Sequence, residues 1–597
     1  MERDRALDSR RAALSMVLLV LLAAAAYLAY RGTSPRRMRV WSRGPDLAVR
    51  NVELPFRFAG EKTYIDLSVQ FDLPRLHARV FDLHYDDCIS ELAVNGKLLA
   101  GLAYPLCRYP EGHTVDLGEH LRPGENRLNL RLVSREPPGV FDLRVAGRDP
   151  VHRAITILVC CILLLVGLQF VSLRAPEHRL FWGAGVLGCV LRFLYYAETP
   201  YWLRAYDWGP HLNYIRFVSE NWQVPAPWQG PVHESWEYHQ SPLYYFLMAL
   251  WLRLANLFGA PARLFVEQAQ FLAFLISAAS LLLALLAVRD LLHDRPRYGL
   301  VSLPAALFAA FCPALVFFAS RISNDGLVQL FNIALFWRLV HWRRTAASRD
   351  WVLMMLLGAL GILTKLNAAV FAALPFILLP FERRLGWRRK AVMACIGLAI
   401  MALSCGWYAA VRVRQAERQT LMGAHAPARA LRLENDARYY LTFNPAAVLR
   451  QPFNNPWRAE SRRAFFWEYL LRSAFFGEFS FPRLALSARL VLLSAMCALP
   501  LLLLGCARSL RASPFAAAPV HLLGAALLLS LLYVRLRHPY PFAQDFRFVV
   551  WLVVPLGYYA AEAQSMMPKR WLRLAALAVL SLPGFAAALM LLSAVCC

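Results

Sequence analysis

Charged residues are scarce in this chain of 597 residues, because Asp, Glu, Lys and Arg together make up only 17% of it. Soluble domains usually carry about 25% charged residues. Hydrophobic residues reach 58%, and many stand in runs long enough to cross a bilayer, which takes about 20 helical residues. This composition excludes a single soluble domain and predicts an integral membrane protein with many crossings.

Cysteine patterns typical of metal sites are also missing. The 12 cysteines include no Cys-x-x-Cys pair and no Cys/His spacing of a zinc site. Most lie in or beside apolar runs, where cysteine is usually a small buried side chain. Cys88 and Cys107 lie in a polar region instead. They form a disulfide if that region faces an oxidising compartment, and otherwise remain two free thiols.

Acidic residues are fewer than basic ones, which gives a net charge of +26. The Arg and Lys residues gather at the ends of apolar runs, as in Arg343-Arg344 and Lys569-Arg570, and not in a continuous basic face. Basic residues retained on the cytoplasmic side fix the orientation of membrane helices. The charge therefore indicates topology and disfavours nucleic-acid binding.

The apolar runs predict about 13 transmembrane helices. We place them at 14–30, 152–173, 180–197, 264–288, 299–320, 326–341, 351–363, 367–381, 390–411, 486–507, 515–534, 546–563 and 571–594. Segment 14–30 is interpreted as an uncleaved N-terminal anchor within residues 1–35, because its apolar run is long for a signal peptide and no good cleavage site follows.

Basic loops then define the cytoplasmic side. The N-terminus and the loops at 289–298, 342–350, 382–390, 508–513 and 564–573 all fall inside, so loops 198–263 and 412–485 fall outside. Segment 241–258 is also apolar, but a crossing there would place the later basic loops outside. We therefore expect it to lie in the outer interface as a helix.

Residues 36–150 differ from the rest, because they are polar and alternate with a period of two. Leu128, Leu130 and Leu132 share one face, and Asn95-Gly96 is a strong hairpin signal. Short strands with regular turns predict an extracytoplasmic β-sandwich. The segment DDCISELAVNGKLL and the later VDLGEHLRPGENRLNLRL resemble galactose-binding-like jelly rolls. That resemblance implies contact with carbohydrate, and the alternative is a structural spacer.

Polar and aromatic residues are dense in the first large outer loop. Asp207, His211, Glu237, His239 and Tyr244 lie there among Trp and Tyr residues. Carboxylates and imidazoles among aromatic rings at a membrane surface indicate a site for a polar ligand with a ring face. The alternative for Asp207 is a solvated acid in a loop. Asp207, His211, Glu237 and His239 could together bind a divalent cation, and the alternative is that they form hydrogen bonds to a sugar.

Four motifs follow one another in residues 190–565. They are Asp207 with His211 followed by the stretch from Glu237 to Tyr245, then Arg321-Ile-Ser-Asn324-Asp325-Gly, then the Gly-rich segment ending in Thr364-Lys365, then Gln544-Asp545-Phe-Arg547-Phe. Their order resembles that of GT-C-type membrane glycosyltransferases, such as protein O-mannosyltransferases and the lipid A aminoarabinose transferase. The chain departs from the family pattern at Trp208, where a Glu is frequent, and at Ser241, where a Pro is usual. These departures leave the acceptor class open.

The resemblance implies a GT-C-like transmembrane catalytic domain at 151–597, in the inner membrane, that uses a polyprenyl-phosphate-linked sugar and an extracytoplasmic glycan, lipid or protein acceptor. No other cofactor is required, although a divalent cation remains an option. Inverting transfer needs a general base, for which we select Asp207, and cations for the departing phosphate, for which we select Lys365, Arg547 and Arg321. Groups expected to bind sugar or acceptor are His211, Glu237, His239, Asn324, Asp325, Tyr244, Glu478 and Asp545.

Simpler roles exist for several of these residues. Asp325 is a good helix N-cap, Lys365 is able to snorkel to the interface, and Asp545 and Arg547 are able to pair with neighbours. Two other functions stay open for the whole chain. A transporter or flippase of a lipid-linked saccharide would show mid-membrane ionisable groups and repeated halves, and a non-catalytic assembly subunit would tolerate loss of Asp207 and Lys365.

Overall fold

The computed structural model divides into two compact units, and each is described by itself. It describes residues 35–43, 49–52, 54–58, 64–85, 88–99, 101–107, 112–133, 139–205, 207–226, 235–257, 265–292, 298–415, 431–512 and 515–596. The predicted anchor at 14–30 lies outside these ranges. One unit contains the described parts of 1–170, 196–205 and 254–268, and the other contains those of 171–195, 206–253 and 269–597.

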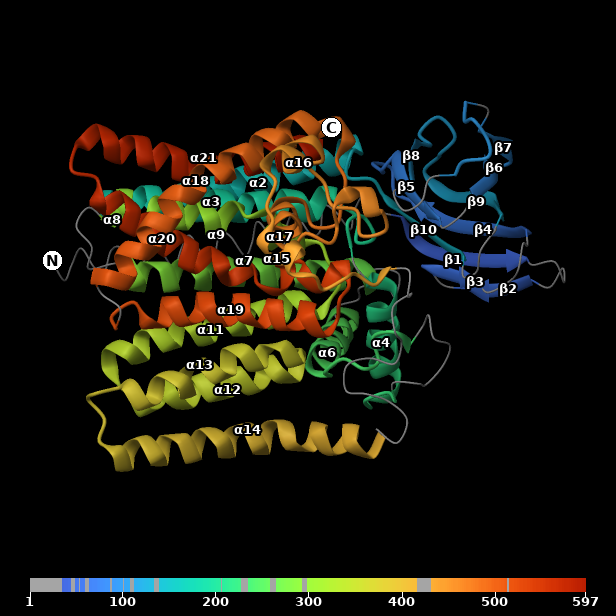
Figure 1. The fold of residues 1–597 in the computed structure, drawn as a ribbon. Coiled ribbons are helices and arrows are strands. Elements are labelled where there is room, and N and C mark those ends of the chain that lie inside the picture. The colour runs from blue at the N-terminus through green and yellow to red at the C-terminus, as the bar shows by residue number, and fades with distance from the viewer. Residues whose placement is uncertain are drawn as a thin grey trace, which may run out of the picture. The chain divides into compact units, whose positions relative to one another are not determined.

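The first unit is built on two antiparallel sheets (Figure 1). The six-stranded sheet has the order β2-β1-β4-β9-β6-β7, and the four-stranded sheet has the order β3-β10-β5-β8. The strands are β1 Arg36–Arg43, β2 Val49–Val52, β3 Phe56–Phe58, β4 Tyr64–Leu73, β5 Val80–Tyr85, β6 Cys88–Val94, β7 Lys97–Leu98, β8 His113–Asp116, β9 Gly124–Val133 and β10 Gly139–Val145.

Side-chain alternation explains how the sheets pack. Leu128, Leu130 and Leu132 of β9 are at most 3% exposed and enter one core with residues of both sheets. This two-sheet packing agrees with the predicted sandwich, whereas the jelly-roll type stays a prediction. Asn95 and Gly96 both adopt positive φ, at 51° and 82°, so they form the predicted hairpin turn between β6 and β7.

A disulfide joins Cys88 and Cys107, which decides between the two alternatives left by the sequence. Cys88 begins β6, and Cys107 follows Leu106, which pairs with Ile89 in an isolated bridge. The bond therefore closes a loop against the edge of the six-stranded sheet. After β10, Asp149 accepts hydrogen bonds from the backbone N–H groups of Val151 and His152 and so caps α2 (Pro150–Ser172).

The second unit is a helical bundle (Figure 1). Its helices and 3₁₀ turns are α3 Pro176–Glu198, α4 Trp208–Asn221, α6 Leu243–Leu257, α7 Phe265–Leu292, α8 Tyr298–Val301, α9 Leu303–Phe311, α10 Pro313–Val316, η2 Phe317–Ala319, α11 Asn324–Thr345, α12 Ser348–Thr364, η3 Leu366–Ala368, α13 Ala369–Leu378, η4 Leu379–Phe381, α14 Trp387–Gln415, α15 Ala437–Leu441, α16 Pro445–Arg450, η7 Ala459–Ser461, α17 Phe466–Phe476, η8 Pro482–Leu484, α18 Ala485–Ala512, α19 Ala518–Arg537, η9 Pro541–Gln544, η10 Phe546–Phe548, η11 Val550–Leu552, α20 Val553–Met566 and α21 Arg570–Cys596.

The chain is a multi-pass membrane protein by the length and apolar character of its helices. Within the described ranges, seven helices are long and apolar enough to cross a membrane, or eight if the bent pair Gly299–Phe311 and Pro313–Ala319 is one span. The other four predicted spans in these ranges also fall on helices. However, α12, α13 and α20 have 17, 10 and 14 residues, fewer than the roughly 20 that a crossing usually takes, and α11 carries Asn, Asp, Gln and Arg side chains. The total of 13 therefore stays a prediction.

One end of the bundle gathers the basic loops. Glu382 binds Arg343 and Arg384, each at 2.7 Å, and Arg384 also donates to the backbone oxygen of Arg343. Arg383 stacks over the ring of Phe515, at 5.5 Å. Loops 342–350 and 382–390 therefore meet each other and the start of the segment before α19. The two loops thus share one end of the bundle, and the side of the membrane that this end faces stays a prediction.

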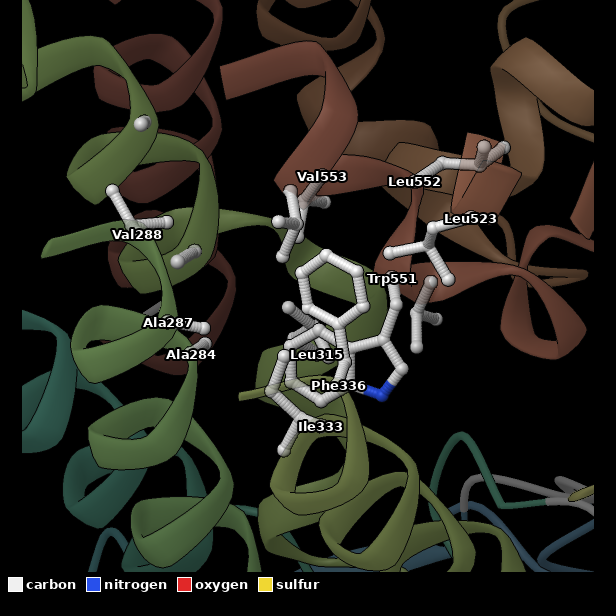
Figure 2. Close-up of a cluster of buried hydrophobic side chains, with 14 of the residues drawn as sticks. Ala284, Ala287, Val288, Leu315, Ile333, Phe336, Leu523, Trp551, Leu552 and Val553 are labelled. Atoms are coloured by element: carbon white, nitrogen blue, oxygen red, sulfur yellow. The ribbon is translucent and has the colours of Figure 1, made fainter. Parts of the chain in front are cut away.

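A buried aromatic and aliphatic cluster holds the centre of the bundle (Figure 2). Trp551 lies among side chains of α7, α10, α11, α19 and α20, and it is 1% exposed. Its indole N–H donates to the backbone oxygen of Gln329 in α11 at 3.0 Å. Because η10 closely precedes Trp551, this packing fixes the segment that carries Arg547 against α11.

Candidate functional site

The polar motifs of the loops predicted to lie outside meet at the end of the bundle opposite the basic loops. This end contains the start of α11, the end of α12, the end of α14, the loop before α6 and the turn η10. Figure 1 shows α4 and α6 lying at this end of the helices. Every residue selected from the sequence as a site residue falls within the described part of the second unit.

An ion pair joins α11 to the end of α12. The Nζ of Lys365 lies 2.5 Å from Oδ1 of Asp325, and the two side chains are 17% and 8% exposed. Ser323, and not Asp325, caps α11 by accepting from a backbone N–H. Lys365 also lies over the ring of Phe548, at 5.6 Å. Asp325 and Lys365 are therefore ion-pair partners. Neither helix capping by Asp325 nor snorkelling of Lys365 accounts for their positions.

Asp207 stands immediately before α4 and has an exposed side chain. Its φ of 47° is left-handed, a conformation that Asp adopts more readily than most residues. The carboxylate makes no capping hydrogen bond to α4. Surrounding protein limits its hydration and so raises the pKa of Asp207, while the charges of Arg547 and Lys365 act in the opposite direction. Asp207 is thus an exposed carboxylate whose charged form is favoured by Arg547 and Lys365.

Arg547 and two further acids extend the site. Asp545 caps η10 by accepting from the backbone N–H of Arg547 at 2.7 Å. Glu478 accepts from the hydroxyl of Tyr469 at 2.9 Å. Burial, and then the charge of Asp545, raise the pKa of Glu478 to about 7, against the effect of Arg547. Residues that stand far apart in the sequence thus share one electrostatic environment.

Glu237 is a deeply buried acid in the loop 235–242. It is 5% exposed, and its Oε2 has no hydrogen-bond partner among the residues that the structure describes. Burial is the largest cause that raises the pKa of Glu237 to about 8, followed by the negative charge of Asp207, while Lys365 lowers it. This carboxyl group therefore tends to keep its proton near neutral pH.

Two histidines are held by hydrogen bonds in the same region. Nδ1 of His211 lies 2.8 Å from the hydroxyl of Tyr245, and burial lowers the pKa of His211 to about 3, with Lys365 acting in the same direction. His239 contacts the backbone oxygen of Trp236 through Nδ1, at 2.8 Å, and the amide of Gln240 through Nε2, at 3.1 Å. Both rings are thereby fixed in orientation.

The amide of Gln240 connects this loop to α11. Its Oε1 accepts from Nδ2 of Asn324 at 3.2 Å, and Asn324 also donates to the backbone oxygen of Thr364. Asn324 therefore ties the loop, α11 and α12 together. Tyr244 lies next to these groups, with its ring 6.4 Å from that of His211, and is 1% exposed.

Arg321 occupies an aromatic environment. Its guanidinium lies 5.1 Å from the ring centroid of Phe317 and 5.2 Å from that of Phe479, and the side chain is buried. This places Arg321 between the end of the broken span and the segment that carries Glu478. Its predicted role as a third phosphate-binding cation is less direct than those of Lys365 and Arg547.

The donor groups do not suit a metal ion. Among the residues described, no three His, Cys, Asp or Glu side chains lie in an arrangement that would hold one. A ring nitrogen of His211 and one of His239 already form hydrogen bonds within the protein, and the carboxylate of Asp325 is already paired with Lys365. The geometry thus gives no support to the divalent-cation option.

Arg412 is a site-supporting residue that the motifs did not reveal. It is 6% exposed at the end of α14 and donates to the backbone oxygens of Tyr238, at 2.5 Å, and Gln240, at 3.0 Å. It also donates to the backbone oxygen of Pro225. In the sequence, Arg412 and the exposed Arg414 look like the ordinary basic end of a helix. The role of Arg412 becomes visible only in the structure, through its contacts with the loop 235–242.

Comparison with known proteins gives structural similarities at low identity. No family profile and no curated protein matches the chain. The chain is similar to the arabinosyltransferase EmbB from Mycobacterium smegmatis, with a TM-score of 0.38 and 11% identity over 93% of this chain and 53% of that one. It is also similar to the oligosaccharyltransferase AglB from Archaeoglobus fulgidus, determined with an inhibitory peptide and a dolichol-phosphate.

The second similarity has a TM-score of 0.37 and 13% identity, and covers 70% of this chain and 56% of AglB. The chain thus spans little more than half the length of each neighbour. The first neighbour is named as an arabinosyltransferase and the second as an oligosaccharyltransferase.

Proposed function

We propose that this protein transfers a sugar from a polyprenyl-phosphate-linked donor to an extracytoplasmic acceptor, with inversion at the anomeric carbon. The observation that carries the proposal is that Asp207 before α4, the Lys365–Asp325 ion pair and the segment of Arg547 held by Gln329 lie at one end of the bundle. A base and cations are the two elements that this reaction needs, and many-pass helices provide a surface for a lipid donor.

Asp207 acts as the general base. The acceptor hydroxyl oxygen attacks the anomeric carbon and gives its proton to the Asp207 carboxylate as the new bond forms. The bond between that carbon and the phosphate oxygen breaks, and the phosphate leaves on the lipid with the electron pair. The raised pKa of Asp207 makes it a stronger base than an ordinary aspartate, which favours proton transfer at neutral pH.

Lys365 and Arg547 stabilise the negative charge that grows on the leaving phosphate, with Arg321 as a more distant third cation. Asp325 holds Lys365 in place through their ion pair, so it acts through that cation. Hydrogen-bonding groups around them then recognise the sugar and the acceptor. We assign this role to His211, Glu237, His239, Asn324, Tyr244, Glu478 and Asp545.

The site faces the extracytoplasmic side in this proposal. The basic loops gather at the other end of the bundle, and basic loops are retained in the cytoplasm. The Cys88–Cys107 disulfide supports an oxidising compartment for the sheet domain. The inner membrane with a periplasmic site satisfies both observations.

The test uses purified full-length protein in lipid nanodiscs with a panel of polyprenyl-phosphate sugars, and follows release of lipid phosphate and glycosylation of the acceptor. Asp207→Asn should lower kcat by at least about 10²-fold, as expected for loss of a general base. Glu460→Gln, which changes an exposed acid outside the site, should keep wild-type turnover.

Wild-type turnover by Asp207→Asn contradicts the base assignment. The two other functions would give different results. A flippase would move labelled lipid-linked sugar across a vesicle membrane without releasing lipid phosphate. An assembly subunit would support polymer formation in cells even when Asp207 and Lys365 are both replaced.

A further inference from the structure

Arg192 lies in the second half of α3, inside an apolar span that offers no obvious use for a cation. Its side chain is 1% exposed. A charged residue inside a membrane span is costly and usually has a specific task. The guanidinium donates to the backbone oxygens of Ala310, at 2.6 Å, Ala309, at 3.1 Å, and Gly188, at 3.0 Å. Its partners are thus carbonyl groups on α9 and on its own helix.

Pro313 explains why the carbonyl of Ala309 needs a donor, and the carbonyl of Ala310 lies at the C-terminal end of α9. An α-helix would satisfy the oxygen of Ala309 with the N–H of residue 313, but proline has none. The span bends by 48° between Gly299–Phe311 and Pro313–Ala319. Arg192 supplies the missing donor, and its positive charge lies at the C-terminal end of α9, where the helix dipole is negative. Gly188 permits this approach, because an added Cβ would lie 2.7 Å from that of Ala310.

The second half of the broken span leads directly into the candidate site. Tyr195, one turn beyond Arg192 on α3, packs against Phe317 with ring centroids 5.5 Å apart. Phe317 in turn lies under the guanidinium of Arg321. The chain then reaches Asp325 within a few residues. The direction of α10 and η2 therefore determines where Arg321 and Asp325 stand.

A small cavity of about 10 Å³ lies next to the Arg192 guanidinium. Its lining includes Arg192, Ser277, Ser280 and Gln329. The Nε of Arg192 has no hydrogen-bond partner among the described residues. The volume is close to what one water molecule needs. The amide of Gln329 donates to the backbone oxygen of Arg547, so polar groups run from the helix break toward the second cation of the site.

We propose that Arg192 is a positioning residue, which closes the break at Pro313 and thereby sets the placement of Arg321 and Asp325 for sugar transfer. This inference rests on the proposed function. It acts through the backbone of α9 and α10, and Arg192 does not touch the substrate.

The experiment combines Arg192→Met, Arg192→Lys, Pro313→Ala and the double variant Arg192→Met/Pro313→Ala, with exposed Arg349→Met at the basic end as the control. Unfolding temperature in detergent and kcat and KM for lipid-phosphate release are measured for each. Arg192→Met should lower the unfolding temperature and lower kcat by about 10²-fold, because groups of the site are displaced. Arg192→Lys should recover part of both.

The double variant separates positioning from general stability. The Pro313→Ala change restores a backbone N–H that can donate to the carbonyl of Ala309, so the double variant should unfold at a higher temperature than Arg192→Met. Its kcat should stay low, because the straightened span no longer directs Arg321 and Asp325 correctly. Three results would overturn the proposal. The effects of the two substitutions on unfolding temperature could be additive. Arg192→Met could keep the wild-type kcat, or the double variant could recover kcat together with stability.

The proposed function fails separately. If the wild-type protein releases no lipid phosphate from any donor, that function is wrong. The coupling of positions 192 and 313 in unfolding temperature still decides whether Arg192 closes the break.

Discussion

The carboxyl group of Glu237 is buried beside other acids, and this has a consequence for stability. Its pKa is raised to about 8 in the folded protein, chiefly by burial, whereas an unfolded chain releases the proton near the ordinary value of 4.5. Between these values the folded state holds a proton that the unfolded state has lost. The stabilisation is therefore complete below pH 4.5 and disappears as pH rises through about 8.

We expect the unfolding temperature in detergent to fall between about pH 5 and about pH 8. Glu237→Gln should make this dependence shallower, because a neutral amide has no proton to lose, while Glu478, whose pKa is also raised, keeps part of the slope. The wild-type change should be on the order of a few kcal/mol. Glu460→Gln is the matched control at an exposed position. An equally steep curve for Glu237→Gln would show that Glu237 does not keep its proton in the folded state.

Among single residues, Asp325 and Lys365 show what the sequence left undecided. Each had a simpler role available, as a cap and as a snorkelling side chain. The fold instead brings them within 2.5 Å, across 40 positions of the chain. No local pattern encodes that distance, because it depends on how α11 packs against α12.

Among elements, the loop 235–242 depends on α14 for its shape. Arg412 donates to the backbone oxygens of Tyr238 and Gln240, and the hydroxyl of Tyr408 also donates to Gln240. Glu237 lies within this anchored stretch. The last turn of α14 therefore holds a loop that contributes an acid and a histidine to the site.

Arg412→Met should leave these carbonyls without their charged donor and loosen the loop. We expect kcat/KM for sugar transfer to fall by about 10²-fold, because small displacements of site groups are costly. Arg414→Met, two residues away on the exposed side of α14, should behave as wild type. Equal effects of the two variants would mean that Arg412 does not hold the loop for activity.

The sequence predicts where the helices lie in the described ranges, but it does not predict where two of the spans are interrupted. Each predicted span in the described ranges coincides with helix. However, the run at 299–320 is bent at Pro313, and the segment at 546–563 begins with the turns η10 and η11 before α20 starts at Val553. Apolar composition records that a segment is buried in lipid or protein, but the backbone hydrogen bonds decide where a helix ends.

At the scale of the whole molecule, the two ends of the bundle differ in charge and in chemistry. The basic loops interlock at one end, and the candidate site lies at the other. If the positive loops are cytoplasmic, single cysteines at the two ends should react differently with a membrane-impermeant maleimide.

In a background without free cysteines, Glu460→Cys should be labelled in intact cells. Arg349→Cys should be labelled only after the membrane is permeabilised. Both positions are exposed, so access and not burial decides the result. Labelling of Arg349→Cys in intact cells would contradict the orientation, while leaving the geometry of the site unchanged.

Composition and periodicity were enough to predict the membrane character, the helical segments, the sheet domain and the polar motifs. Both are local properties of the chain. Three contacts became visible only in the folded protein. Asp325 pairs with Lys365, Arg412 anchors the Glu237 loop, and Arg192 donates to the carbonyl that Pro313 leaves without a helical donor. Such contacts join distant segments, and their geometry arises only when the helices pack.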